Sequence, residues 1–176
     1  MQTEKVIEHI VHWLGDYQRS SRTKGFIVGV SGGIDSAVVS SLCARTGSPV
    51  LVVEMPIRQS TSEVQRSRAH INWLKEHFPN VTGTEINLTD VFEAIEKTVS
   101  KSEVNESNAL TELALANVRS RLRMVSRRDD DLRHAVADLF QINLYYFASI
   151  KGYLVAGTGN KVEDFGVGFY TKYGEQ

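Results

Sequence analysis

Cysteine, proline and long apolar runs are all scarce in this sequence of 176 residues. The single cysteine, Cys43, lies in an apolar stretch and has no second cysteine in the sequence to pair with, so we expect a buried structural thiol rather than a nucleophile. No run approaches the roughly 18 apolar residues of a membrane-spanning helix, and charged residues interrupt segment 1–17, unlike in a signal peptide. We therefore expect a cytoplasmic protein with no membrane contact.

An excess of charge of one sign is also lacking. The 20 Lys and Arg residues nearly balance the 21 Asp and Glu residues, for a net charge of -1, so no overall field attracts nucleic acid. Any site for a phosphate-bearing ligand must therefore be local. With 41% hydrophobic and 23% charged residues the chain can bury one core, and we expect residues 1–176 to form a single domain.

Short apolar runs alternate with helical patterns along the chain. The first helix is expected from the spacing of Ile7, Ile10, Val11 and Leu14, with Gly15 as its end. Strands are expected at 26–30, 50–53, 81–86 and 153–156, and helices at 35–45, 61–78, 88–99 and 108–125. This order predicts an α/β fold in which a parallel, twisted sheet carries helices on both faces.

The sequence from Ser31 to Ser36, Ser-Gly-Gly-Ile-Asp-Ser, connects a predicted buried strand to a helix. Two glycines allow a sharp turn that brings backbone N–H groups against an anion, and the helix adds its positive end. The serine hydroxyls can donate to phosphate oxygens, and Asp35 can hold Mg²⁺. A glycine-rich turn with serine and aspartate caps explains the same residues on loop statistics alone.

The sequence contains neither a Walker A motif nor a Gly-x-Gly-x-x-Gly motif after a strand. The segment 31–36 resembles instead the loop of the ATP pyrophosphatases, the group that includes NAD synthetase, GMP synthetase and asparagine synthetase. The resemblance implies an adenine nucleotide alpha hydrolase-like (Rossmann-like) three-layer sandwich, in which this loop holds the pyrophosphate released from ATP. The residues that it places at ATP are Gly29, Ser31, Gly32, Gly33, Asp35 and Ser36.

Two later segments, 157–164 (Gly-Thr-Gly-Asn-Lys-Val-Glu-Asp) and 166–174 (Gly-Val-Gly-Phe-Tyr-Thr-Lys-Tyr-Gly), resemble NAD synthetase in particular. Loops at the carboxyl ends of parallel strands line the ligand crevice of such folds, so these segments and the Ser31 loop can face one site. On residue types alone, a solvated loop explains the acids of segment 157–164. The resemblance implies ATP contacts for Thr158 and Gln59, Mg²⁺ ligation by Glu163 with Asp35, and a place beside deamido-NAD for Lys172.

A third pattern is the pair Asn117 and Arg121, which share one side of a predicted helix because they are four residues apart. A guanidinium suits either a phosphate or a carboxylate. The resemblance implies that this pair binds the nicotinate dinucleotide, whereas an exposed basic helix face is the ordinary explanation. No residue is assigned a catalytic role beyond holding the ligands.

Two departures from the family touch the expected site. About seventeen residues, within segment 126–142, intervene between parts that are almost continuous in the family, and they are expected to lengthen the preceding helix or to form an extra one. The family also continues beyond the match to Tyr173 and Gly174, whereas this sequence ends at Gln176. The resemblance therefore implies a NAD synthetase domain without the C-terminal part of the family.

The function expected from the resemblance is an ammonia-dependent, NAD-forming ligase of NAD biosynthesis. ATP adenylates the carboxylate of deamido-NAD with release of pyrophosphate, and ammonia displaces AMP; Mg²⁺ is the cofactor and a homodimer is expected. Two alternatives stay open. One is another ATP pyrophosphatase, such as GMP synthetase or a tRNA-thiolating enzyme, and the other is a relative that binds nucleotide without turnover.

Overall fold

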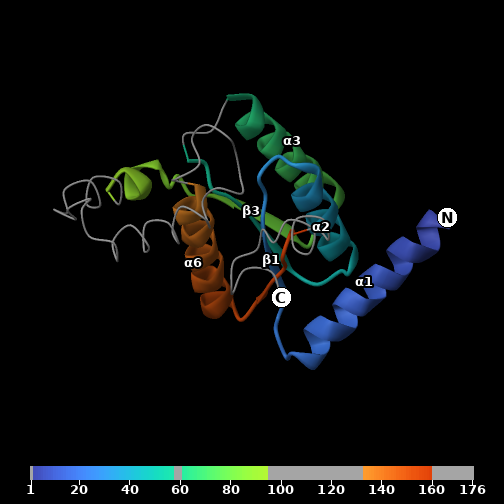
Figure 1. Ribbon diagram of the computed structural model, residues 1–176. Helices are drawn as coiled ribbons and strands as arrows, with labels where there is room; N and C mark the ends of the chain where they lie inside the picture. The colour runs from blue at the N-terminus through green and yellow to red at the C-terminus, as the bar shows by residue number, and fades with distance from the viewer. Residues whose placement is uncertain (1, 58–60, 95–132, 160–176) are drawn as a thin grey trace, which may run out of the picture.

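The computed structural model describes residues 2–57, 61–94 and 133–159. Its strands are β1 (Phe26–Gly29), β2 (Val50–Glu54), β3 (Val81–Glu85) and β4 (Leu154–Val155). Its helices are α1 (Thr3–Ser20), α2 (Ile34–Arg45), α3 (Thr61–His77) and α6 (Arg133–Lys151), and residues 89–94 are also helical. Figure 1 shows these elements in chain order.

The four strands form one parallel sheet in the order β3-β2-β1-β4. Phe26 at the start of β1 is in register with Val50 of β2 on one side and with Leu154 of β4 on the other. Val50 is in turn in register with Val81 of β3. The parallel α/β sheet expected from the alternation of strands and helices is confirmed.

The central strands have two apolar faces because successive side chains point to opposite sides of a sheet. Phe26, Val28, Val50 and Val52 belong to one cluster, which also contains Cys43 of α2 and Leu74 of α3. Ile27, Leu51 and Val53 point the other way and pack with Leu139, Leu144 and Ala148 of α6. Figure 1 accordingly shows α6 on one side of the sheet and α2 and α3 on the other.

The side on which each helix lies follows from the strand order. A crossover between neighbouring parallel strands is almost always right-handed. The steps from β1 to β2 and from β2 to β3 run in one direction across the sheet, so α2 and α3 share a face. The chain then returns to the other side of β1 to form β4, and the helix that precedes β4 covers the opposite face.

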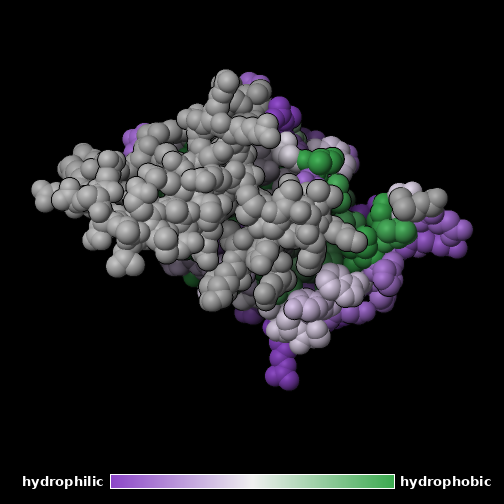
Figure 2. Space-filling model, viewed as in Figure 1, coloured by the Kyte–Doolittle hydropathy of each residue, from purple (hydrophilic) through white to green (hydrophobic). Residues whose placement is uncertain are grey.

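Helix α1 forms an outer layer that packs on α2. Its Ile7, Ile10, Val11 and Leu14 are partly buried, and Figure 2 shows hydrophobic surface on the side of the molecule where α1 and α2 lie. The expected end at Gly15 is wrong, because the helix continues to Ser20 and Gly15 is buried inside it. A single glycine lowers helix stability by only about 1 kcal/mol, which tertiary packing can offset.

The segment 126–142 is described only from residue 133 onward. There it forms the first half of α6 and continues without a break into the residues that pack on the sheet. Residues 133–142 thus share one helix with the residues that follow and do not stand as a separate helix. The expected lengthening of the helix 108–125 falls outside the described residues and stays a prediction. Leu139, within this part, is buried against the sheet, which explains why the helix extends so far.

Candidate functional site

The turn between β1 and α2 has the backbone geometry of an anion-binding loop. Gly32 has φ +82, a left-handed conformation that residues with a Cβ rarely adopt. Gly33 is the N-cap of α2 and has no side chain to occupy the helix end. The N-cap residue therefore places no side-chain cap on the first N–H groups of α2, and a helix end of this kind, with its positive dipole, suits an anion.

Hydrogen bonds among the two serines and the glycine backbone close this loop on itself. The backbone N–H of Ser31 donates to Ser36 Oγ at 3.3 Å, and the Ser36 hydroxyl donates to the carbonyl of Gly33 at 3.1 Å. The N–H of Gly33 donates to Ser31 Oγ at 3.3 Å. Ser36 is 3% exposed whereas Ser31 is exposed, so Ser36 fixes the loop from within while Ser31 faces outward.

Asp35 is exposed in the first turn of α2, directly after the loop. Acidic side chains are favoured at this end of a helix by its dipole. A carboxylate beside a phosphate-binding loop is also the kind of ligand that Mg²⁺ takes, since Mg²⁺ is usually held by one or two carboxylates together with phosphate oxygens and water. The position of Asp35 therefore fits the metal-binding role expected of it.

Gly29, at the end of β1, lies below the loop and faces α6. A Cβ at this position would lie 3.4 Å from Leu144 Cδ1 and 3.6 Å from Met55 Cε. Its backbone belongs to the strand that leads into the loop. The structure thus gives Gly29 a packing role beneath the site, and its expected contact with ATP stays a prediction.

Thr158 follows β4, the strand that lies beside β1 in the sheet. Strands β1 and β4 are parallel neighbours, with Ile27 in register with Val155, and the N–H of Ala156 donates to the carbonyl of Ile27 at 2.9 Å. Both strands end at the same edge of the sheet, and α2, which follows β1, lies on the opposite face from α6, which precedes β4. The strand order reverses at this point, and open α/β sheets bind ligands where it does.

Helix α3 contacts the N-terminal half of α2 near the loop. The Nε of Arg66 donates to the carbonyl oxygen of Gly32 across 3.5 Å. Ser40 Oγ lies 2.9 Å from His70 Nε2 and donates to the carbonyl of Ser36 at 2.7 Å. Burial lowers the pKa of His70 from its ordinary value of 6.5.

A buried carboxylate lies at the carboxyl end of β2. Glu54 is 3% exposed and accepts hydrogen bonds from the Ser67 hydroxyl and from Arg68 Nε, the latter at 3.3 Å. Arg68 Nη2 also donates to Glu85 at the end of β3, at 2.8 Å. The hydrogen bond to Glu54 and the charge of Glu85 raise the pKa of Arg68 above its ordinary value. This network ties α3 to the ends of two neighbouring strands.

Cys43 has no access to the site. It is 0% exposed inside α2, and burial raises its pKa to about 12, so the thiolate does not form at neutral pH. The expectation of a buried structural thiol is confirmed.

The other predicted ligand-binding residues lie outside the described residues. They are Gln59 for ATP, Asn117, Arg121 and Lys172 for deamido-NAD, and Glu163 for the metal. Within the part of the chain that the structure describes, no three His, Cys, Asp or Glu side chains gather into a metal site. Among the same residues, no helix is long and apolar enough to cross a membrane.

The contacts of Arg66, His70 and Glu54 were not expected from the sequence. The sequence around Glu54 held a sign of its burial, since this residue directly follows four apolar strand residues and precedes three more buried ones. A charge in such a run requires a partner. The sequence held no such sign for Arg66 and His70, because their hydrogen-bond partners lie 34 and 30 residues away in the chain. These contacts depend on how α3 packs on α2.

Comparison with known proteins gives a consistent result along nearly the whole chain. The family model described as NAD synthase matches residues 6–176. An NH3-dependent NAD+ synthetase from Carboxydothermus hydrogenoformans is 32% identical over 173 residues, which are 98% of this chain and 60% of that protein. Its counterpart from Finegoldia magna is 30% identical over 176 residues, 99% of this chain and 61% of that protein.

Solved structures agree with this assignment. The NMN synthetase from Francisella tularensis superposes with a TM-score of 0.70 at 25% identity, over 99% of this chain and 61% of that chain. The NH3-dependent NAD synthetase from Campylobacter jejuni gives a TM-score of 0.68 at 25% identity, over 99% of this chain and 63% of that chain. The chain spans about 60% of the length of the curated relatives that it matches.

Proposed function

Because this chain belongs to the NAD synthase family, we propose that it carries the ATP-binding part of an ammonia-dependent ligase that forms NAD from deamido-NAD. The observation that carries the proposal is the preformed Ser31–Ser36 loop at the point where the strand order reverses. A left-handed glycine, a helix end whose N-cap is a glycine and an exposed hydroxyl together suit a polyphosphate.

The proposed reaction has two steps. A carboxylate oxygen of deamido-NAD attacks the α-phosphate of ATP, and the bond to the β-phosphate breaks with release of pyrophosphate. Ammonia then attacks the acyl carbon of the adenylate, loses a proton and displaces AMP to leave the amide. The protein holds two anionic ligands in line, which lowers the barrier by positioning and by charge stabilisation.

Each residue expected at the site has a place in this proposal. The loop N–H groups and the Ser31 hydroxyl hold the phosphates that leave as pyrophosphate, and Ser36 keeps the loop in shape. Thr158 contacts ATP from the neighbouring strand end. Asp35 would hold Mg²⁺, with Glu163 as a second ligand, and the bound ion would neutralise charge on the phosphates. Gln59, Asn117, Arg121 and Lys172 complete the ATP and deamido-NAD contacts.

We also propose a homodimer in the cytoplasm. The outer side of α6 exposes four large apolar side chains at helical spacing: Ile142 (66% exposed), Tyr145 (46%), Tyr146 (60%) and Ile150 (64%). A helix side of this kind is typical of a surface that a partner covers.

The solved structures suggest one alternative to deamido-NAD as the substrate. The relative from Francisella tularensis is an NMN synthetase, so amidation of a mononucleotide is the second candidate reaction. The same carboxylate would be adenylated, and the difference lies in how much of the ligand beyond the nicotinate nucleotide the protein contacts.

Pyrophosphate release tests these proposals. With ATP, Mg²⁺ and ammonium present, release is expected with deamido-NAD and to be slower or absent with nicotinate mononucleotide; Arg121→Ala is expected to raise the KM for deamido-NAD. Pyrophosphate release with nicotinate mononucleotide but not with deamido-NAD favours the NMN-forming reaction. Release that needs neither nicotinate substrate favours another ATP pyrophosphatase, and ATP binding without any release favours a non-catalytic nucleotide-binding relative.

A further inference from the structure

Arg66 places a positive charge beside the phosphate-binding loop from a different helix. It lies in the second turn of α3, is exposed, and contacts the Gly32 carbonyl oxygen through Nε at 3.5 Å. Gly32 is the loop residue with the left-handed backbone. The guanidinium therefore lies against the residue that gives the loop its shape.

The neighbouring Arg68 shows what distinguishes Arg66. Two carboxylates, Glu54 and Glu85, bind the guanidinium of Arg68 at 3.3 and 2.8 Å. Among the described residues, Arg66 forms no such ion pair. A guanidinium carries five N–H donors in a rigid fork, and the contact with Gly32 uses Nε alone.

We propose that Arg66 is a further phosphate-binding residue, whose terminal N–H groups contact the β- and γ-phosphates of ATP and the pyrophosphate that they become. This inference rests on the proposed function. The loop N–H groups approach the same phosphates from α2, so Arg66 closes the site from α3. A guanidinium suits two phosphate oxygens at once, and such charge-assisted bonds are stronger than neutral ones.

A structural role is the competing explanation. In that case Arg66 only holds the Gly32 peptide in place, and its removal weakens the binding of every nucleotide that contacts the loop. The choice of ligand distinguishes the two roles. AMP lacks the β- and γ-phosphates, whereas ATP contains them and pyrophosphate is formed from them.

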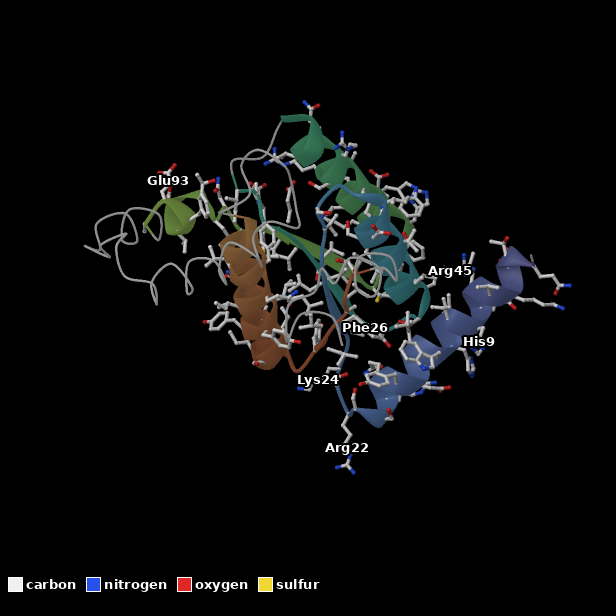
Figure 3. The ribbon with its side chains drawn as sticks, viewed as in Figure 1. His9, Arg22, Lys24, Phe26, Arg45 and Glu93 are labelled. Atoms are coloured by element: carbon white, nitrogen blue, oxygen red, sulfur yellow. The ribbon has the colours of Figure 1, made fainter. Side chains whose placement is uncertain are left out.

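Calorimetric titration of the full chain with Mg-ATP, Mg-pyrophosphate and AMP tests the proposal in wild type, Arg66→Ala and Arg66→Lys. Arg45→Ala is the matched control, because it removes the same charge from the opposite end of α2, where Arg45 pairs weakly with Glu4 at 3.7 Å (Figure 3). Thermal unfolding of each variant establishes that the fold is intact.

Arg66→Ala is expected to bind ATP and pyrophosphate about tenfold more weakly while its affinity for AMP stays unchanged. Arg66→Lys should recover part of the loss, and Arg45→Ala should match wild type. The proposal is overturned if Arg66→Ala binds ATP and pyrophosphate like wild type, or if it loses AMP and ATP equally. In either case the proposed function stands as long as wild type binds ATP. Wild type that binds neither ATP nor pyrophosphate overturns both.

Discussion

At the scale of single residues, the shape of the candidate site depends on Gly32. Its φ of +82 lets the chain turn from β1 into α2 within a few residues, and its carbonyl is held by Arg66. A Cβ at such a conformation costs about 1–2 kcal/mol. Gly47, which follows α2, has a similar φ of +77, and a Cβ there would meet nothing within 4 Å.

Gly32→Ala and Gly47→Ala form a matched pair. Both are expected to lower the free energy of unfolding by about 1 kcal/mol, because both force an L-residue into the left-handed region. Only Gly32→Ala should also weaken ATP binding, by tenfold or more. Urea unfolding and calorimetric ATP titration measure the two effects. Equal ATP affinity in the two variants would contradict the placement of phosphate at this loop.

His70 gives the fold a pH dependence with a definite sign. Burial lowers its pKa below the 6.5 of the unfolded chain, so the unfolded state takes up a proton first as the pH falls. Stability contributed by neutral His70 is complete above about pH 6.5 and is lost as the pH falls below that value toward the lower pKa of the folded state. Urea unfolding between pH 5 and 8 should show this loss in wild type.

His70→Gln is expected to make that pH dependence shallower, whereas His9→Gln, at an exposed position of α1, should leave it as in wild type. An identical slope in His70→Gln and wild type would show that the Ser40–His70 contact does not set the pH response.

The residues of the loop were predictable because the chemistry is local: two glycines, two serines and an aspartate lie within six positions. The contacts that α3 makes near the loop could not be predicted from the sequence. Arg66 reaches Gly32 and His70 reaches Ser40 only after α3 has packed on the sheet, and nothing in their immediate sequence distinguishes them from exposed helix residues.

At the scale of elements, the position of each helix follows from which strand face it covers. Leu74 of α3 is 0% exposed and packs into the cluster of Phe26, Val28 and Val52. This anchor holds α3 where Arg66 reaches the loop and where Arg68 binds Glu54.

Leu74→Ala is expected to lower the free energy of unfolding by about 2–5 kcal/mol, because it removes a buried side chain and leaves a cavity. Asn72→Ala, at an exposed position of the same helix, should change it by no more than about 0.5 kcal/mol. Urea unfolding of the two variants tests this. Similar values for both would mean that α3 is not anchored through Leu74.

The strands could be predicted more accurately than the helix ends. Runs of β-branched residues mark β1 and β2, and the observed bounds differ from the expected ones by a residue. The end of α1 was missed because tertiary packing outweighs the cost of Gly15. The family comparison shows where residues are added, but not that residues 133–142 join the helix that follows them.

At the scale of the whole molecule, the apolar outer side of α6 is the surface that the homodimer proposal uses. Light scattering is expected to give a mass near twice the 19.7 kDa of the chain. Tyr146→Glu should shift that mass toward the monomer, while Tyr17→Glu, at a similarly exposed aromatic position of α1, should not. A monomer at every concentration of the wild type would remove the dimer proposal.

The most direct test of the central claim is a calorimetric titration with Mg-ATP of wild type, Asp35→Asn and Asp16→Asn. Both variants replace an exposed aspartate with its uncharged isostere, one beside the Ser31–Ser36 loop and one on α1. If the loop and Asp35 hold the phosphates and Mg²⁺ of ATP, wild type and Asp16→Asn bind ATP alike and Asp35→Asn binds it at least about tenfold more weakly. Absence of ATP binding in wild type, or equal affinity in all three proteins, would contradict it.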